Sequence, residues 1–244
     1  MKALLLSAGL GTRLKPFTLK TPKCLIKING KPLLEHWLQI LFASGISEIL
    51  INTHYLAEQV EAFVLQSEFK NKISISYEQS LLGTGGTLLQ NKLFFENEDF
   101  LVAHSDNFCI CDFRNFIEMH FDRPKETLMT MMTFITDKPE TCGIVELNKE
   151  KVVKEFYEKV SNPPSSLANA AVYIISSQIF NFIEKNSIKL NDISLDLIPC
   201  LNKKIFTWHN NIYNKDIGTP ETLKECRQEV GKFNYFIDQY FNIN

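Results

Sequence analysis

The sequence predicts an α/β fold in which a mostly parallel sheet is flanked by helices. Short apolar runs alternate with longer amphipathic segments, and two of the apolar runs lead into glycine-containing loops. No run approaches the roughly 18 apolar residues that a membrane span needs. Alternation of this kind is typical of parallel strands joined by helical crossovers, which bind ligands at the carboxyl ends of the strands.

The first half of the chain gives this alternation most clearly. Pro32 stands near the start of one expected helix, where its missing N–H costs nothing, and Ser44-Gly45 ends that helix. Expected strands cover residues 2–7, 48–52, 73–77 and 99–104, and expected helices cover residues 31–44, 56–68, 86–93 and 112–122.

The second half contains more strands than helices. A polar turn at residues 148–151 joins two strands into an expected hairpin, and residues 215–220 are expected to form a tight turn. Expected strands cover residues 127–134, 142–147, 152–157, 167–175 and 205–208, and expected helices cover residues 177–185 and 220–230. The aromatic tail to Asn244 is expected to pack on the body of the protein or on a partner subunit, which would make a homodimer.

Composition excludes several classes of partner. A net charge of −2 provides no general attraction for nucleic acid or an anionic membrane, so neither is expected as a partner. The apolar start is too short for a signal peptide, and we expect a cytoplasmic location. The six cysteines lack paired C-x-x-C spacing, so we expect structural thiols rather than a disulfide framework or a zinc site.

The loop after the first strand carries the features of a phosphate site. Gly9 and Gly11 let backbone N–H groups approach a phosphate closely, because no Cβ stands in the way. Arg13 adds a planar charged fork, and Lys23 adds a mobile point charge.

Two further features lie at the same expected edge. Three glycines within Gly83–Gly86 are costly at a helix start unless backbone touches a ligand, and free helix N–H groups would follow; an ordinary turn is the alternative. Asp106 follows a buried strand, where a carboxylate can hold Mg²⁺ or simply cap a helix.

Together these motifs resemble the signature of the sugar-1-phosphate nucleotidyltransferases over nearly the whole chain. The resemblance rests on Ala8-Gly9-x-Gly-Thr-Arg-Leu-x-Pro16, Pro22-Lys23, Leu82–Gly86, Ser105-Asp106, Glu158-Lys159, Asn169-Ala170 and Asp216–Pro220, in the family's order. It implies a Rossmann-like mixed sheet with a small β-hairpin sugar-binding subregion. We therefore predict one domain over 1–244, with a nucleotide-binding part (about 1–110), a sugar-phosphate-binding part (about 111–220) and a C-terminal helix and tail (221–244).

The resemblance also implies an activity. A nucleoside triphosphate and a sugar 1-phosphate would condense to a nucleoside-diphosphate sugar and pyrophosphate, mainly through positioning and charge neutralisation. It implies that Arg13, Lys23, Asp106 and Asp216 are catalytic and that Asp106 and Asp216 hold Mg²⁺. The implied nucleotide-binding residues are Ala8, Gly9, Gly11, Thr12, Arg13, Lys23, Gln79, Gly83 and Thr84, and the implied sugar-phosphate-binding residues are Gly143, Glu158, Lys159 and Asn169.

Several substrate choices and functions stay open at this point. The loop at residues 82–86 looks most like that of guanylyltransferases for mannose or manno-heptose 1-phosphates. Uridylyltransferases for glucose or N-acetylmuramate 1-phosphate, and cytidylyltransferases for non-sugar phosphates, are the alternatives. A non-enzymatic sensor is disfavoured because the charged residues are all present. An NAD-binding loop is disfavoured because Leu14 replaces the third glycine of G-x-G-x-x-G.

Three features depart from the family pattern. Ala171 replaces a usual glycine, where its methyl group could narrow the sugar pocket, and Ser7 stands where Ala or Gly is common. No hexapeptide repeat follows Asp216, so we expect no fused acetyltransferase.

Overall fold

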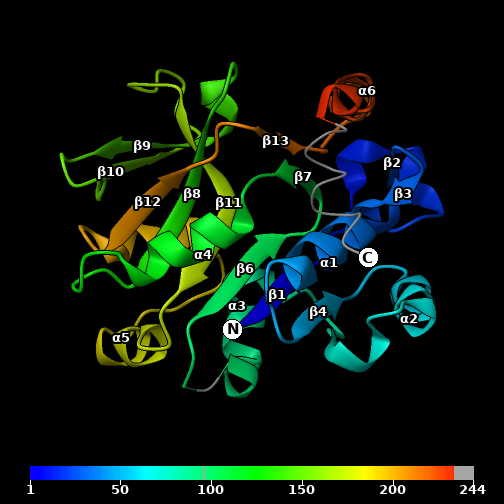
Figure 1. Ribbon diagram of the computed structural model, residues 1–244, viewed down its shortest axis with the longest axis horizontal. Coiled ribbons are helices and arrows are strands. Elements are labelled where there is room, and N and C mark those ends of the chain that lie inside the picture. Colours follow the sequence, from blue (N-terminus) through cyan, green and yellow to red (C-terminus); the bar gives the residue numbers. More distant parts are fainter. Residues whose placement is uncertain (96, 234–244) are drawn as a thin grey trace. The chain divides into compact units, whose positions relative to one another are not determined.

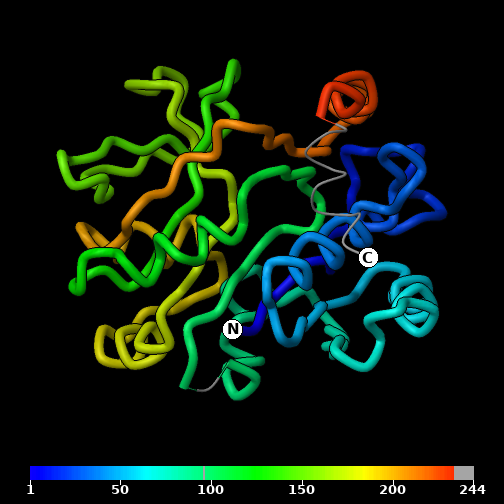
Figure 2. Tube along the Cα trace, in the orientation of Figure 1, coloured from blue at the N-terminus to red at the C-terminus, as the bar shows by residue number. Residues whose placement is uncertain are grey.

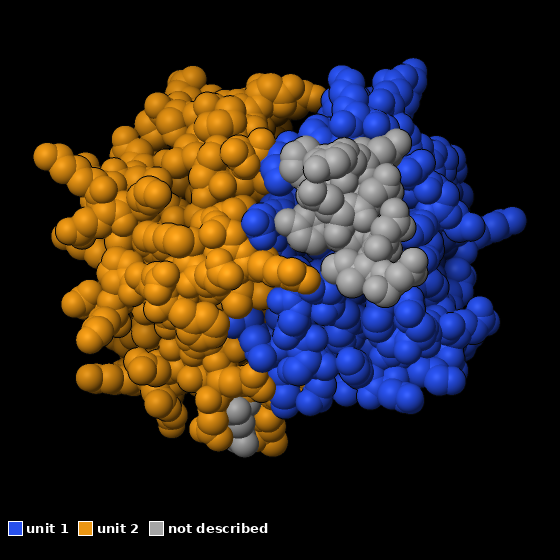
Figure 3. Space-filling model, viewed as in Figure 1, with its two compact units in different colours: residues 1–81, 103–113, 212–244 blue, residues 82–102, 114–211 orange. Residues whose placement is uncertain are grey.

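The computed structural model describes residues 1–95 and 97–233 and confirms the predicted α/β class (Figure 1). The chain forms two compact units (Figure 3). Unit 1 contains residues 1–81, 103–113 and the described residues from 212 onward, and unit 2 contains residues 82–102 and 114–211. The tail at 234–244, for which we predicted packing, lies outside the described residues.

The parallel strands of unit 1 form its centre. β1 (Lys2–Leu6), β4 (Ile49–Thr53) and β5 (Ile73–Tyr77) pair in parallel, with β4 in the middle. β1 and β4 are almost wholly buried, as expected for parallel strands covered on both faces. The helices α1 (Leu33–Ala43) and α2 (Ala57–Gln66) connect these strands.

Two small antiparallel pairs complete unit 1. β2 (Lys27–Ile28) and β3 (Lys31–Pro32) join through Asn29 and Gly30, whose φ angles of 50° and 81° suit a tight hairpin turn. β7 (Asn107–Ile110) pairs with β13 (Tyr213–Asp216), and α6 (Pro220–Glu229) follows. The predicted tight turn at 215–220 is therefore wrong, because Lys215 and Asp216 are strand residues that pair with β7.

Unit 2 is built on a mixed sheet. β11 (Leu167–Ile175) lies antiparallel to β8 (Met129–Ile135) and to β9 (Gly143–Leu147). β9 and β10 (Val153–Glu158) form the predicted hairpin, and β12 (Ile205–His209) runs parallel to β8. The helices are α3 (Gly83–Gln90), α4 (Phe113–Phe121) and α5 (Ile179–Lys185).

Short helical turns fill many of the connections. Residues Ile193–Leu197 form one π-helical turn. The 3₁₀ turns are Thr12–Leu14, Phe17–Leu19, Lys23–Leu25, Lys70–Lys72, Lys92–Phe95, Pro139–Thr141, Ile198–Leu201 and Val230–Phe233.

The two units are interleaved along the chain. The backbone passes between them after residues 81, 102, 113 and 211, the second time within β6 (Phe100–His104) (Figure 2). This division differs from the consecutive parts that we predicted, since Gly83 and Thr84 fall in unit 2 and Asp216 falls in unit 1.

Two further observations concern the cysteines and the lengths of the helices. All six cysteines are free, and Cys24, Cys109, Cys111 and Cys226 are buried. Among the described residues, no helix is long and apolar enough to cross a membrane.

Candidate functional site

The loop after β1 uses its two glycines differently. Gly11 has a φ of +61°, and a Cβ there would meet the methyl group of Thr18 at 2.8 Å. The Thr18 hydroxyl also donates to the Gly11 carbonyl oxygen over 2.8 Å. Apart from Gly9 itself and its two chain neighbours, no described residue has an atom within 4 Å of the place where a Gly9 Cβ would be. Packing therefore requires glycine at position 11, whereas the backbone at Gly9 is open to approach.

Three charged residues predicted to share a site lie together in unit 1. The Lys23 ammonium donates to Asp106 Oδ2 over 2.6 Å and to Asp216 Oδ1 over 3.3 Å. The pairing of β7 with β13 places Asp216 opposite Asn107, the neighbour of Asp106. Arg13 Nη2 lies 4.0 Å from Asp216 Oδ2. We refer to Lys23, Asp106 and Asp216 as the charge triangle.

The charge triangle favours the charged forms of Lys23 and Asp106. Burial alone would lower the pKa of Lys23, but the two neighbouring carboxylates raise it more, and the net shift is upward. Burial would raise the pKa of Asp106, but Lys23 and His104 lower it more. The Lys23 side chain is only 10% exposed. The expectation of a mobile lysine is therefore wrong for this conformation, in which two ion pairs hold Lys23.

The same place offers oxygen ligands to a metal. Within the part of the chain that the structure describes, no three His, Cys, Asp or Glu side chains group as a metal site, so the donor set is two carboxylates. Mg²⁺ bound to phosphates usually takes one or two protein carboxylates, and the pair of aspartates fits that requirement.

A buried polar chain lies behind the loop, and our sequence analysis missed it. The Ser7 N–H donates to Asn52 Oδ1 over 2.7 Å, and Asn52 Nδ2 donates to Glu78 Oε1 over 2.8 Å. The Ser7 and Ser105 hydroxyls are 2.7 Å apart. These contacts connect the start of the loop to Ser105, which precedes Asp106, and to Glu78, which precedes Gln79. The Gln79 side chain itself is exposed. Ser7, which stands where Ala or Gly is common in the family, is thus a structural part of this region.

In unit 2, Gly143, Glu158 and Lys159 lie together. Glu158 pairs with Gly143 across β9 and β10, and Lys159 Nζ lies 3.1 Å from Glu158 Oε1. A Cβ on Gly143 would approach the Phe156 ring to 2.6 Å and Glu158 Oε2 to 2.7 Å, so glycine makes room for both side chains. Lys159 has a φ of +49°, a strained conformation of the kind that gathers at functional sites.

Asn169 is held in one orientation within β11. Its Oδ1 accepts the Ala171 N–H over 2.9 Å, and its Nδ2 donates to the Tyr173 hydroxyl over 2.8 Å. Ala171 has a φ of +54°, and the pairing of β11 with β8 shifts between Asn169 and Tyr173. Position 171 therefore has the backbone conformation that favours glycine.

The second glycine loop does not present a free helix terminus. The N–H groups of Gly85 and Gly86 donate to the Asn191 carbonyl oxygen over 2.8 and 3.3 Å, so our prediction of free N–H groups there is wrong. The Thr84 hydroxyl donates to Asp192 Oδ2 over 3.1 Å and accepts the Ile193 N–H over 2.8 Å. A Cβ on Gly83 or Gly85 would collide with residues 190–191, so packing explains both glycines.

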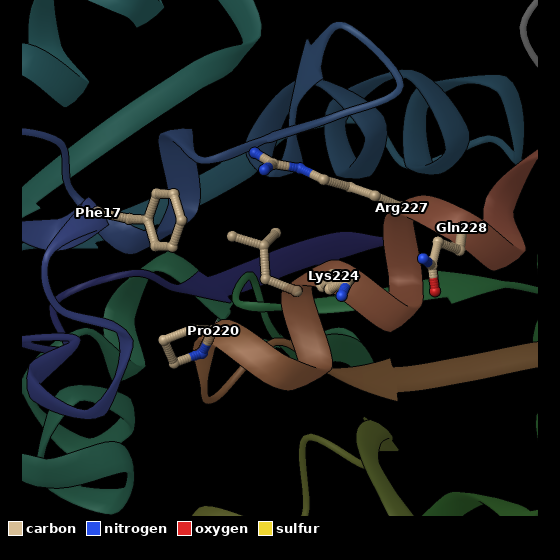
Figure 4. A pocket seen from close by; sticks show the side chains of 6 residues that line it. Phe17, Pro220, Lys224, Arg227 and Gln228 are labelled. Carbon is tan, nitrogen blue, oxygen red and sulfur yellow. The ribbon is translucent and has the colours of Figure 1, made fainter.

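A separate pocket lies beside α6 and contains none of the predicted site residues (Figure 4). The Arg227 guanidinium lies 5.9 Å from the Phe17 ring centre and donates to the Lys27 carbonyl oxygen over 3.0 and 3.2 Å. The lining residues are Phe17, Pro220, Leu223, Lys224, Arg227 and Gln228.

Comparison with known proteins decides the family. The family model described as "Nucleotidyl transferase" matches residues 2–232. The chain belongs to the nucleotidyl transferase family. This family membership confirms the resemblance predicted from the motifs.

Individual relatives in sequence and in structure are also nucleotidyl transferase-like proteins or share their fold. The mannose-1-phosphate guanylyltransferase catalytic subunit beta of Drosophila melanogaster is 31% identical over 227 residues, which cover 90% of this chain. The chain spans about 60% of the length of that relative. The crystal structure of HddC from Yersinia pseudotuberculosis matches with a TM-score of 0.78 at 26% identity, covering 94% of this chain and 99% of HddC.

A third likeness concerns the fold alone. The apo structure of a UDP-glucose pyrophosphorylase matches with a TM-score of 0.79 at 21% identity, covering 96% of this chain and 99% of that one. Together with the HddC likeness, it supports the predicted Rossmann-like sheet with flanking helices.

Proposed function

We propose that this member of the nucleotidyl transferase family condenses a nucleoside triphosphate with a sugar 1-phosphate. The observation that carries the proposal is the charge triangle beside Arg13 and the phosphate loop. A sugar-phosphate oxygen would attack the α-phosphorus, and the bond from that phosphorus to pyrophosphate would break. Both substrates are strongly anionic, so catalysis depends on placing positive charge at this point.

The loop residues would hold the triphosphate. The open backbone at Gly9, the N–H groups of Gly11 and Thr12, and the exposed Arg13 fork suit phosphate oxygens, with Ala8 beside them. Lys23, released from one carboxylate, would donate to the α-phosphate. Gln79, Gly83 and Thr84 remain our predicted base-reading residues.

Asp106 and Asp216 would hold Mg²⁺. A bound divalent cation neutralises phosphate charge and fixes the orientation of the reacting groups. Lys23 and His104 lower the pKa of Asp106, which favours the ionised form that binds a cation.

The sugar phosphate would bind to residues of unit 2. Lys159 suits the phosphate, while Gly143, Glu158 and Asn169 suit the sugar hydroxyls. The fixed orientation of the Asn169 amide and the strained backbone of Lys159 support this assignment.

We propose GTP as the nucleotide and mannose 1-phosphate or a manno-heptose 1-phosphate as the acceptor. The name of the Drosophila relative supports guanylyl transfer to mannose 1-phosphate, and HddC was also crystallised with GMP-PN. Uridylyl and cytidylyl transfer remain the alternatives. The cytoplasmic location and the homodimer stay predictions from the sequence.

Pyrophosphate release tests the proposal. Each of four nucleoside triphosphates is assayed with Mg²⁺ against mannose, manno-heptose, glucose and N-acetylmuramate 1-phosphates and phosphocholine. We expect release with GTP and a manno-configured sugar phosphate, and its loss in Asp216→Asn with the fold intact by circular dichroism. Absence of release with every pair would contradict the proposal, and full activity in Asp216→Asn would remove this residue from the metal site.

A further inference from the structure

Strand β13 and helix α6 are joined in unit 1 by polar side chains that the reaction proposed above does not use. Tyr213 and Lys215 on β13, together with Glu225 and Glu229 on α6, form this group, which we term the α6 clamp. Asp216 directly follows Lys215 along β13 (Figure 1). We propose, resting on the proposed function, that Lys215 and its clamp partners are positioning residues that set the affinity of the charge triangle for a divalent cation.

The contacts of the α6 clamp converge on Glu229. Lys215 Nζ donates to Glu229 Oε2 over 3.0 Å and lies 2.9 Å from Glu225 Oε2. The Tyr213 hydroxyl donates to the same Glu229 oxygen over 2.6 Å. The Lys215 side chain is only 22% exposed, so water screens these ion pairs less than it screens pairs on an open surface. The clamp therefore fastens β13 to α6.

The clamp residues and Asp216 lie on opposite faces of β13. Side chains alternate along a strand, so Tyr213 and Lys215 share the face towards α6, whereas Asp216 projects from the other face towards Lys23. A rotation of β13 about its own axis would therefore move Asp216 relative to Asp106. The clamp opposes this rotation, because hydrogen bonds and ion pairs of this kind are directional.

Strand β13 depends on such contacts because its sheet is small. Among the described strands it pairs only with β7, and an isolated pair of strands is marginally stable. A neighbouring apolar cluster, which includes Phe108, Ile110, Ile217 and Leu223, packs β7 and α6 together. Apolar packing has no preferred direction, so the orientation of β13 is left to its polar contacts.

Helix α6 is also bonded to the segment that carries Lys23. Arg227 donates to the carbonyl oxygen of Lys27, four residues after Lys23, over 3.0 and 3.2 Å. The helix thus contacts both the strand of Asp216 and the chain that follows Lys23. Loss of the clamp would consequently change how Asp216 lies relative to the rest of the charge triangle.

Direct measurement of cation binding separates positioning from simple electrostatics. Lys215→Met removes a positive charge next to Asp216, which by itself would tighten cation binding. Loss of positioning has the opposite sign. We expect the affinity of the full chain for Mn²⁺, measured by electron paramagnetic resonance without nucleotide, to fall about fivefold, which is the value of one hydrogen bond.

A second variant leaves every charge in place. Tyr213→Phe removes only the hydroxyl that Glu229 accepts, and it should weaken Mn²⁺ binding in the same direction. It decides the question if Lys215→Met does not fold. The Mg²⁺ concentration that gives half-maximal pyrophosphate release should rise in both variants.

Two control variants test the specificity of the effect. Lys215→Arg keeps a charged donor for both glutamates and should bind Mn²⁺ within twofold of wild type. Lys224 lies on the same helix beside the separate pocket and has no ion pair among the described residues (Figure 4). Lys224→Met should therefore also bind Mn²⁺ within twofold of wild type.

The outcomes distinguish this inference from the proposed function. Unchanged or tighter Mn²⁺ binding in Lys215→Met and Tyr213→Phe, with or without a lower melting temperature, overturns the positioning role alone. A wild type that binds no Mn²⁺ overturns the inference as well. A wild type that releases no pyrophosphate with any substrate pair overturns the proposed function, whereas the Mn²⁺ titrations still test the clamp.

Discussion

The two carboxylates around Lys23 indicate its chemical role as a fixed positive charge. Its ammonium faces two carboxylates, and its raised pKa keeps it charged throughout the physiological range. A charge placed where phosphate charge develops stabilises the transition state more than the bound substrate.

We predict that Lys23→Met lowers kcat by about 100-fold, a typical effect of removing one electrostatic stabiliser, while the KM of the nucleotide changes far less. Steady-state pyrophosphate release measures both parameters, and Lys20→Met, an exposed lysine nearby, serves as the control. A loss expressed mainly in KM would instead make Lys23 a ground-state binding residue.

Ala171 gives a second prediction at this scale. A φ of +54° costs an L-residue roughly 1–2 kcal/mol, and glycine would relieve this strain. Glycine also lowers stability by about 0.5–1 kcal/mol, because it increases the entropy of the unfolded chain. Ala171→Gly should therefore raise the free energy of unfolding by about 0.5–1 kcal/mol in urea titrations.

The neighbouring alanine is a matched control for this substitution. Ala170 is buried in the same strand and does not share the positive φ. Ala170→Gly should destabilise the protein by about 1 kcal/mol or more, through the lost methyl group and the added chain entropy. Equal destabilisation by both variants would show that the backbone at position 171 is not strained.

Among the elements, α6 is the one that follows directly from a residue of the charge triangle. It begins at Pro220, and its cap Thr219 lies three residues after Asp216. The Thr222 hydroxyl accepts the Thr219 N–H over 3.0 Å, and the Thr219 hydroxyl accepts the Thr222 N–H over 3.3 Å. Pro220 at the first helical position supports this start.

We predict that Thr219→Ala lowers the free energy of unfolding by about 1 kcal/mol, the usual cost of losing an N-cap side chain. Thr222→Ser keeps a hydroxyl at the third helical position and should stay within a few tenths of a kcal/mol of wild type. Urea unfolding followed by circular dichroism measures both, and an unchanged Thr219→Ala would mean that the cap contributes nothing.

Local patterns predicted most elements but not their long-range partners. The apolar runs at β5 and β11 and the turn between β9 and β10 are local signals, and the structure confirms them. The last two residues of β13, Lys215 and Asp216, were predicted as part of a turn, because their strand character comes from pairing with β7, far earlier in the chain. Similarly, nothing in the glycines of α3 reveals that Asn191 will occupy their N–H groups.

In the candidate site, too, the motif residues could be predicted from the sequence, whereas their long-range supporting residues could not. Motif resemblance selected Lys23, Asp106 and Asp216 for one site, and their side chains do meet. Asn52 and Glu78 belong to no motif that we singled out, and only the fold places them behind the loop. Glu78 immediately precedes the predicted site residue Gln79, but the sequence does not reveal that Glu78 is buried. Its role behind the loop could therefore not be predicted.

For the molecule as a whole, stability against acid depends on a cluster in unit 2. Asp99 Oδ2 accepts from His120 Nε2 over 2.9 Å and from Arg123 Nη2 over 3.1 Å, and its Oδ1 accepts the Ser177 N–H. Burial would raise the pKa of Asp99, but these partners lower it to about 2. Burial lowers the pKa of His120 below its usual value, so the folded protein takes up this proton at a lower pH than the unfolded chain does.

Both shifts predict loss of stability as the pH falls. The unfolded chain takes up a proton at His120 below about pH 6.5, before the folded protein does, so stability declines from there. Asp99 contributes in full above about pH 4 and loses about 2 kcal/mol as the pH falls towards about 2. Urea midpoints from pH 8 to pH 3 measure both effects, and His120→Gln should remove most of the decline between about pH 6.5 and pH 4. A decline of equal size in that variant would assign it to other groups.

The interleaving of the two units bears on how the protein acquires its chemistry during synthesis. Unit 1 consists of three separate segments, and each of them supplies one member of the charge triangle: Lys23, Asp106 and Asp216. A nascent chain that has emerged as far as residue 211 contains all of unit 2 and two of the three charged groups, but it lacks the second carboxylate. The charge triangle can therefore form only after the third segment of unit 1 has been synthesised.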